Sequence, residues 1–366
     1  MTALLLAVAM LGGTTIAPAT IDVRVLTKEH PTQLTFEGPR RGAAALTGGE
    51  LQVNGVTVSM PFVLPPAVWH VRTSGRPPRA YRGAITLTAD GRELAVVVRM
   101  ERERYVALTV AGETTPGTPP AALEAQAIVA RSWAAATPRR HGNADVCDLA
   151  HCQLIRASVS PAHLAAAQRA ALATRGVVLV LASGEIAMAP FHAACGGRTA
   201  DPHEVFGGEN HSGAESIEDP GCDGPRWRAI VSRDVVERAA SETLRGGSSG
   251  PMHAVRLADL ELTAGRGGWV RAVVDTAKGN SAFGDAFVRA LGRAVGWGVV
   301  RGGRFRLRSG AAQDVVIDGV GLGHGVGLCQ TGAARLANAG ETAPEILRHY
   351  FPGAMLVTRA ARELRP

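Results

Sequence analysis

The stretch from Tyr105 to Trp133 places the strongest constraint on how this chain of 366 residues folds. Residues 105–111 are apolar and β-branched and are followed by Gly112, which predicts a buried strand. Thr118 and Pro119 are typical of a helix start, because a hydroxyl caps the first turn and proline needs no amide hydrogen there. The stretch therefore predicts a strand, a loop and a helix in close succession.

The predicted helix carries a narrow stripe of small apolar residues that would let it lie close to its neighbours. The stripe consists of Leu123, Ala127, Ala130 and Ala134. Glu113 lies between the predicted strand and this helix, on a loop rich in glycine and proline, where catalytic groups are often found. A lone loop glutamate is more often a solvated surface acid, so its position alone does not decide its role.

The composition is that of a globular protein, with 46% hydrophobic and 19% charged residues, and its length suits one large domain or two. A net charge of +7 is compatible with a polyanionic partner such as the cell wall. Runs of Lys or Arg never exceed two residues, and no nucleic-acid motif accompanies them. We therefore expect no nucleic-acid partner.

The first residues resemble an export signal. The apolar run from Leu4 to Leu11 is too short to span a membrane, and Ala17-Pro18-Ala19 offers the small residues of a cleavage site. We interpret residues 1–19 as a signal peptide. No Lys or Arg precedes the run, so an uncleaved or misassigned start is the alternative. No later segment predicts a transmembrane helix, and we expect an exported protein, in the periplasm or on the extracellular, cell-wall side.

Residues 20–110 are predicted to be rich in β-strands. Short alternating segments such as Ile21–Leu26 and Ala84–Thr88 are separated by turns that contain glycine and proline. Trp69 and His70 offer a candidate sugar-stacking patch, and the alternative is that the tryptophan belongs to the core.

Four potential metal ligands fall within twelve residues: His141, Cys147, His151 and Cys152. They supply the complete ligand set of a tetrahedral structural zinc site. The alternative is a Cys147–Cys152 disulfide, which is natural in an exported protein. A zinc hydrolase is disfavoured, because four protein ligands leave no position for a catalytic water.

The other cysteines allow a second bridge. Cys195 and Cys222 are candidates for a disulfide across the intervening loop, although each alone is more often a small buried hydrophobe. Cys329 would then be unpaired and buried.

Glycine occupies every second position from Gly319 to Gly327, alternating with aliphatic residues and His324. If this segment is extended, one face carries no side chains and permits close approach by a polymer. The glycine spacing does not match a dinucleotide-binding fingerprint. Without further context, His324 is more often a hydrogen-bonded core histidine than an acid or base.

Four motifs in this order resemble the SpoIID/LytB family, stage II sporulation protein D and its relatives. They are Glu113 with Gln126 thirteen residues later, Cys147–Gln153, Ala194–Thr199 and Gly321–Gln330. The resemblance extends from Tyr81 to Gly353. It implies an α+β fold, with the β-rich N-terminal region (20–110) followed by a mixed α/β catalytic core (111–366) that has a long substrate cleft.

The matching family members are lytic transglycosylases, which cut the β-1,4 bond after N-acetylmuramic acid and leave 1,6-anhydro ends. The resemblance implies the same reaction here, on peptidoglycan glycan strands already freed of stem peptides by an amidase, with Glu113 as the catalytic residue. It also implies structural zinc at the histidine and cysteine set. The substrate-binding candidates are Gln126, Arg131, Ser132, Gly196, Gly197, Arg198, Gly323, His324, Gly325 and Gln330. For Arg131 the alternative is a solvated charge on the flank of the helix.

LytB-type relatives stimulate a cell-wall amidase without cutting sugar, so an amidase enhancer that binds glycan is the alternative function. The chain also departs from the family pattern. A Met-Pro-Ala-Ser-Trp segment usually follows the catalytic glutamate, where this chain has Thr114–Thr118, and a customary tyrosine is Thr331. These losses bear on rate and substrate range more than on the type of reaction.

Overall fold

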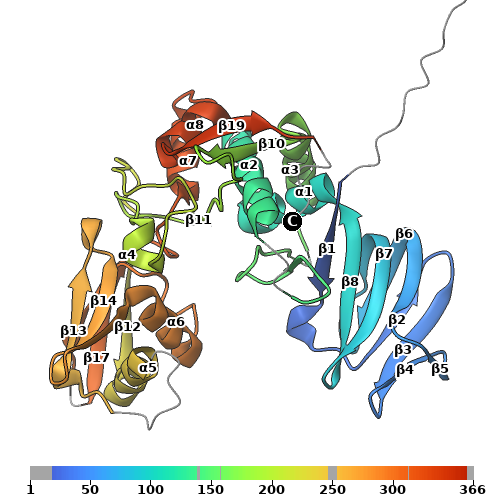
Figure 1. Ribbon diagram of the computed structural model, residues 1–366, viewed down its shortest axis with the longest axis horizontal. Helices are drawn as coiled ribbons and strands as arrows, with labels where there is room; N and C mark the ends of the chain where they lie inside the picture. The colour runs from blue at the N-terminus through green and yellow to red at the C-terminus, as the bar shows by residue number, and fades with distance from the viewer. Residues whose placement is uncertain (1–18, 138–140, 157, 246–253, 312, 361–366) are drawn as a thin grey trace, which may run out of the picture.

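The structure, a computed structural model, describes residues 19–137, 141–156, 158–245, 254–311 and 313–360. It has the predicted α+β arrangement: an N-terminal sheet, a layer of helices, and a third lobe in which two small sheets pack with helices (Figure 1). Except for residue 19, the predicted signal peptide lies outside the described residues. Within those residues, no helix has the length and hydrophobicity needed to cross a membrane.

The N-terminal sheet has nine strands, and all neighbouring strands are antiparallel except β1 and β9. In spatial order they are β5 (Val56–Val58), β4 (Glu50–Val53), β3 (Arg41–Thr47), β2 (Gln33–Glu37), β6 (Phe62–Thr73), β7 (Arg79–Asp90), β8 (Glu93–Glu101), β1 (Thr20–Val25) and β9 (Val146–Cys147). The predicted β-rich N-terminal region is therefore confirmed. The predicted boundary at residue 110 falls within a helix and stays a prediction.

The strand predicted at residues 105–111 is wrong, because these residues belong to helix α1 (Arg102–Glu113). Tyr105, Val106 and Val110 are all fully buried. The helix packs against the sheet on one side and against other helices on the other, so apolar residues surround it. A short apolar run of this kind shows neither the helical nor the strand period.

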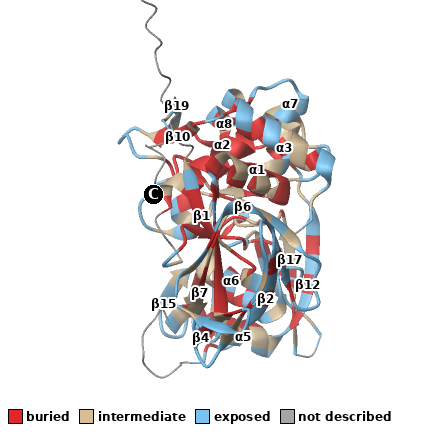
Figure 2. Cartoon of the chain, turned by 90° about the vertical axis from the view of Figure 1, so that its right-hand side faces the viewer, coloured by how far each residue is buried: buried red, intermediate tan, exposed pale blue. Residues whose placement is uncertain are grey.

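Helix α2 (Pro120–Ala136) confirms the second half of the predicted stretch. Its N-cap is Pro119; the hydroxyl of Thr118 instead donates to the carbonyl of Thr115 at 2.8 Å. Through Leu123 and Ala127, the predicted stripe packs into the hydrophobic core that includes the buried residues of the N-terminal sheet. The opposite face packs into a second hydrophobic cluster, which includes Leu179, Leu328 and Ile346. Helix α2 is therefore buried on both sides (Figure 2).

The helical layer continues with elements from the second half of the chain. It contains α3 (Pro161–Ala173), α7 (Gln330–Asn338), α8 (Ala343–Tyr350) and the antiparallel strands β10 (Val177–Leu181) and β19 (Ala354–Thr358). Side chains cap the first turns of α3 and α8. The Ser160 side chain accepts from the N–H of His163, and Thr342 with Glu345 forms the capping box of α8.

The third lobe has its own hydrophobic cluster. One sheet has the order β12 (Arg226–Ser232), β17 (Asp314–Val320), β16 (Phe305–Ser309), and the other has the order β13 (Leu260–Ala264), β14 (Val270–Asp275), β15 (Asn280–Phe283). Helices α4 (Pro202–Phe206), α5 (Arg233–Arg245) and α6 (Gly284–Val295) accompany them (Figure 1).

A buried ion pair ties α2 to α1. The Arg131 side chain is fully buried, and its guanidinium donates to both carboxylate oxygens of Glu103, at 3.0 and 2.5 Å. It also donates to the carbonyl oxygens of Val177 and Ala171, both at 3.0 Å. One arginine therefore joins α1, α2, α3 and the start of β10.

We expect Arg131→Met to destabilise the protein by about 3 kcal/mol, because it leaves the Glu103 carboxylate without its buried partner. Urea unfolding followed by circular dichroism measures this. Arg169→Met is the matched control, since Arg169 is exposed on α3 and its loss should change stability by less than about 0.5 kcal/mol. Equal effects of the two substitutions would contradict the structural role of Arg131.

Candidate active site

Glu113 is the last residue of α1, and its side chain is half-buried. Its Oε1 accepts a hydrogen bond from the backbone N–H of Leu154 at 2.6 Å. Burial raises the pKa of Glu113, while the Leu154 N–H and the charge of Arg156 act in the opposite direction. A carboxyl group with a raised pKa is a candidate general acid. The loop position predicted for Glu113 is wrong by one residue, since the loop begins at Thr114.

The segment that contains Leu154 is fixed on both sides. The Tyr105 hydroxyl donates to Oε1 of Gln153 at 2.7 Å, within the core. Nε of Arg156 donates to the carbonyl of Gly112, next to Glu113, at 2.6 Å. Sequence analysis missed Leu154, because a backbone N–H carries no residue signature, and it missed Arg156, which belongs to no motif.

The four predicted metal ligands come together just before this segment. Their ligand atoms all lie within 4.8 Å of one another: His141, Cys147, His151 and Cys152. Nε2 of His141 is 3.1 Å from Sγ of Cys152, and Sγ of Cys147 is 3.3 Å from Nε2 of His151. Both cysteines are free thiols, so the alternative disulfide is not formed. A tetrahedral zinc ion separates its sulfur and nitrogen ligands by about 3.6 Å, so this donor set fits zinc.

Two aspartates fasten the cluster to the N-terminal sheet. Oδ2 of Asp145 accepts from the N–H of Asp22 at 2.9 Å, and Oδ2 of Asp148 accepts from the N–H of Leu26 at 2.8 Å. They flank Cys147, whose short strand β9 runs parallel to β1. The cluster is therefore held at the edge of the sheet.

Two substrate-binding candidates distant in sequence meet at α2. Nε2 of Gln330, the first residue of α7, donates to Oε1 of Gln126 at 3.3 Å. The Gln126 side chain is buried, and its Nε2 has no hydrogen-bond partner among the described residues. Within that part of the chain, no hydrogen bond joins Glu113 to either glutamine or to His324.

The structure corrects the roles expected for Arg131 and Ser132. Both side chains are fully buried, which leaves no surface for a glycan and also excludes a solvated charge at Arg131. Oγ of Ser132 donates to the carbonyl of Ile128 at 2.7 Å and accepts from the N–H of Leu179 at 2.9 Å. These residues fix α2 in place.

The glycine-rich segment is not extended, so the predicted bare face is wrong. Strand β17 ends at Val320, and Gly323, Gly325 and Gly327 all have positive φ. A Cβ at Gly325 would lie 2.3 Å from the Trp269 ring, and one at Gly327 would lie 2.2 Å from the carbonyl oxygen of Pro190. The glycines are needed because the chain turns in the left-handed region and packs against its own protein.

His324 lies in this segment beside a second histidine, His192, and their ring centroids are 5.8 Å apart. Burial lowers the pKa of His324 to about 4 and that of His192 to about 3, so both are neutral at pH 7. Nδ1 of His324 accepts from the N–H of Val326 at 3.1 Å, and Nδ1 of His192 donates to the carbonyl oxygen of Val326 at 3.2 Å. His324 is thus hydrogen-bonded and neutral. His192, in no motif singled out from the sequence, was missed.

The remaining substrate-binding candidates, Gly196, Gly197 and Arg198, lie close to the glycine-rich segment. Nη1 of Arg304 donates to the carbonyl of Gly196 at 2.6 Å. The partly exposed guanidinium of Arg198 pairs with Glu218 at 2.6 Å, and its carbonyl accepts from the Trp269 indole at 3.1 Å. Gly197, like Gly196, has positive φ.

The predicted Cys195–Cys222 disulfide is absent, since both residues are free thiols. Cys329 is buried as predicted, but it lies beside them: its Sγ is 3.4 Å from that of Cys222. The fold brings a third thiol to the pair, which separation in sequence did not reveal.

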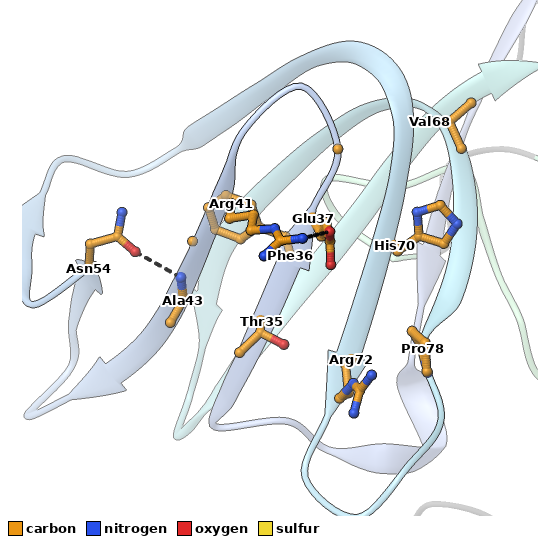
Figure 3. A pocket seen from close by; sticks show the side chains of 12 residues that line it. Thr35, Phe36, Glu37, Arg41, Ala43, Asn54, Val68, His70, Arg72 and Pro78 are labelled. Atoms are coloured by element: carbon orange, nitrogen blue, oxygen red, sulfur yellow. Dashed lines mark hydrogen bonds and ion pairs between the residues drawn. The ribbon is translucent and has the colours of Figure 1, made fainter.

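A hollow of about 950 Å³ opens on strands β2, β3 and β6 of the N-terminal sheet (Figure 3). Glu37, Arg41, His70 and Arg72 are among the residues that line it. The sugar-stacking role considered for Trp69 is wrong, because the ring is fully buried and its Nε1 donates to the carbonyl of Pro65 at 2.9 Å. His70, the other member of the candidate sugar-stacking patch, does line the hollow, but none of the catalytic, substrate-binding or metal-binding candidates does.

Comparison with known families matches one part of the chain. Residues 90–181 match the family model described as SpoIID, stage II sporulation protein. This part of the chain is similar to the SpoIID family. The SpoIID match connects the protein with sporulation and the cell wall, and it contains Glu113, Gln126 and the four metal ligands. The candidates from Gly196 onwards lie outside it. No curated protein matches the chain.

We expect Gly325→Ala to destabilise the protein by more than the about 1–2 kcal/mol that positive φ costs a residue with a Cβ, because the Trp269 ring must also move. Gly184→Ala is the control, since Gly184 has a φ of +90° and open space around it. Thermal unfolding compares the two. A smaller loss of stability for Gly325→Ala than for Gly184→Ala would show that the Trp269 ring accommodates the methyl group.

Proposed function

We propose that the protein is an exported lytic transglycosylase that cleaves peptidoglycan glycan strands with Glu113 as its acid. The observation that supports this most is the state of Glu113. It is a half-buried carboxyl with a raised pKa, held by one backbone hydrogen bond, within the segment that matches SpoIID. A single carboxyl is sufficient for this reaction, whereas glycoside hydrolysis usually needs two.

The orientation of the carboxyl suggests which oxygen acts. Oε1 of Glu113 is engaged by the Leu154 N–H, and among the described residues Oε2 accepts no hydrogen bond. In the proposed reaction, Oε2 gives its proton to the glycosidic oxygen as the bond from that oxygen to C1 of N-acetylmuramic acid breaks. The resulting carboxylate takes the proton of the C6 hydroxyl, whose oxygen bonds to C1. The product is a 1,6-anhydro end, and Glu113 regains its proton without consuming water.

We expect Glu113→Gln to reduce glycan cleavage by at least a hundredfold, because glutamine keeps the shape of the side chain and has no proton to transfer. The assay measures anhydro products by mass spectrometry, with amidase-stripped glycan and intact sacculi as parallel substrates. Glu185→Gln is the control, since Glu185 is exposed on a different loop.

Near wild-type turnover by Glu113→Gln would move the chemistry elsewhere. We also expect stripped strands to be cleaved preferentially, so equal release from intact sacculi would contradict that part of the proposal. Wall digestion that occurs only when an amidase is added, and that survives Glu113→Gln, would instead identify an amidase enhancer.

Arg156 contributes to the pH range of the proposed acid. Its positive charge lowers the pKa of Glu113, and burial raises it. The acid works only while it is protonated, so turnover falls as pH rises through the pKa of Glu113. We expect Arg156→Met to raise that pKa and move the alkaline fall in turnover to higher pH. The pH profile of kcat measures this, with Arg169→Met as control, and a shift toward lower pH would contradict it.

We include structural zinc in the proposal, bound by His141, Cys147, His151 and Cys152. Zinc would hold the loop that leads, two residues after Cys152, to the Leu154 N–H on Glu113. With four protein ligands it would supply no water for chemistry. Its contribution would be to the position and stability of this loop.

We expect Cys152→Ser to lose one zinc ion per chain and to lower the melting temperature, because metal binding is coupled to folding of the loop. Elemental analysis of protein purified without chelator gives the ion count, and calorimetry gives the melting temperature. An unchanged zinc content, or an intact mass that shows a Cys147–Cys152 disulfide, would contradict this assignment.

A further inference from the structure

A second cluster of metal-binding side chains lies outside the SpoIID segment. Its ligand atoms all lie within 4.8 Å of one another, and all four residues are fully buried: Cys195, Asp219, Cys222 and Cys329. Sγ of Cys222 is 3.4 Å from Sγ of Cys329, and Sγ of Cys195 is 3.3 Å from Oδ2 of Asp219. In a tetrahedral zinc site two sulfur ligands are about 3.8 Å apart, so a few tenths of an ångström of opening would admit an ion.

Hydrogen bonds from neighbouring groups hold the side chains of this cluster in place. The Tyr350 hydroxyl donates to Oδ2 of Asp219 at 2.9 Å, and the Arg335 guanidinium donates to Oδ1 at 3.3 Å. The N–H groups of Cys195 and Gly332 point to Sγ of Cys329, at 3.3 and 3.4 Å. Such outer hydrogen bonds orient ligands and stabilise thiolate sulfur in metal sites.

The charges near the cluster also suit a dication. Three thiolates and a carboxylate carry four negative charges, which is prohibitive in a buried site without cations. Arg335 pairs with Asp219, and Arg304 donates to the carbonyl of Cys195 at 3.3 Å. One divalent ion together with these two guanidinium groups balances the four ligands.

A disulfide explains less of this arrangement. A Cys222–Cys329 bond would use two of the three thiols and leave Cys195 facing the buried carboxylate of Asp219. Helix α7 also approaches the carboxylate and its tyrosine partner closely, because a Cβ at Gly332 would lie 2.0 Å from the Tyr350 hydroxyl oxygen and 2.1 Å from Oδ2 of Asp219. We propose that Cys195, Asp219, Cys222 and Cys329 form a second tetrahedral site for a thiolate-binding divalent ion, zinc.

The site would join three separate parts of the chain. Cys195 follows β11 (Phe191–His192), Asp219 and Cys222 lie on the loop before β12, and Cys329 ends β18 (Leu328–Cys329), which pairs with β11. Gln330, the partner of Gln126, is the residue after Cys329. The ion would therefore fix the segments that carry Gly196, Gly197 and Gln330, whether or not the protein cleaves glycan.

Metal content tests the second site separately from the first. Full-length protein purified without chelator is analysed for zinc beside Cys222→Ser, Cys147→Ser and the double variant. We expect two ions per chain in the wild type, one in each single variant and none in the double variant. Cobalt loaded into Cys147→Ser then reports the remaining site, where intense thiolate-to-cobalt absorption is expected.

One ion in the wild type that Cys222→Ser keeps and Cys147→Ser loses would overturn the second site and leave the first intact. One ion in the wild type that Cys147→Ser keeps and Cys222→Ser loses would support the second site and overturn zinc at the first. If Cys222→Ser does not fold, the wild type together with Cys147→Ser still decides, because complete loss of zinc in Cys147→Ser would overturn the second site. Peptide mapping that finds a Cys222–Cys329 disulfide, or an iron–sulfur absorption spectrum, would also overturn the proposal.

Discussion

The burial of α2 on both faces is the constraint on which the rest of the structure depends. One face packs into the core of the N-terminal sheet through Leu123 and Ala127, and the other packs into the second cluster through Ala125 and Val129. A helix between two cores needs small side chains, because close packing leaves no room for bulk. Arg131 is a charged exception, and its charge is met by Glu103 and by backbone carbonyl groups.

This arrangement connects the candidate metal centre to the candidate acid. The metal-binding loop is fastened to β1 by Asp145 and Asp148, and its continuation is fastened to α1 by Tyr105. The hydrogen bond from Leu154 to Glu113 lies at the end of that path. The position of the carboxyl thus depends on a loop with little core of its own, which is where a bound ion contributes most.

The predictions that succeeded rest on local chemistry. Helix α2 starts at proline, which needs no amide hydrogen in the first turn, and the metal ligands lie close together in sequence. The strand expected at residues 105–111 failed, because an apolar run buried on all sides has no visible period. The bare face expected from Gly319 onwards failed too. Alternating glycines are compatible with a strand and with a series of left-handed turns, and Trp269 and Pro190 determine which one forms.

The sequence by itself determined the β-rich N-terminal region, the α2 helix, the compact histidine and cysteine set, and Glu113 as the candidate acid. The first three depend on residues within about one turn or one loop of each other, whereas the role expected for Glu113 came from the motifs that resemble the SpoIID/LytB family. Only the tertiary structure decided that Arg131 and Ser132 are buried, that Gln126 meets Gln330, and that three distant thiols gather around Asp219. The physical reason is that these contacts join segments up to 204 residues apart, and packing between cores, which has no local signature, sets their positions.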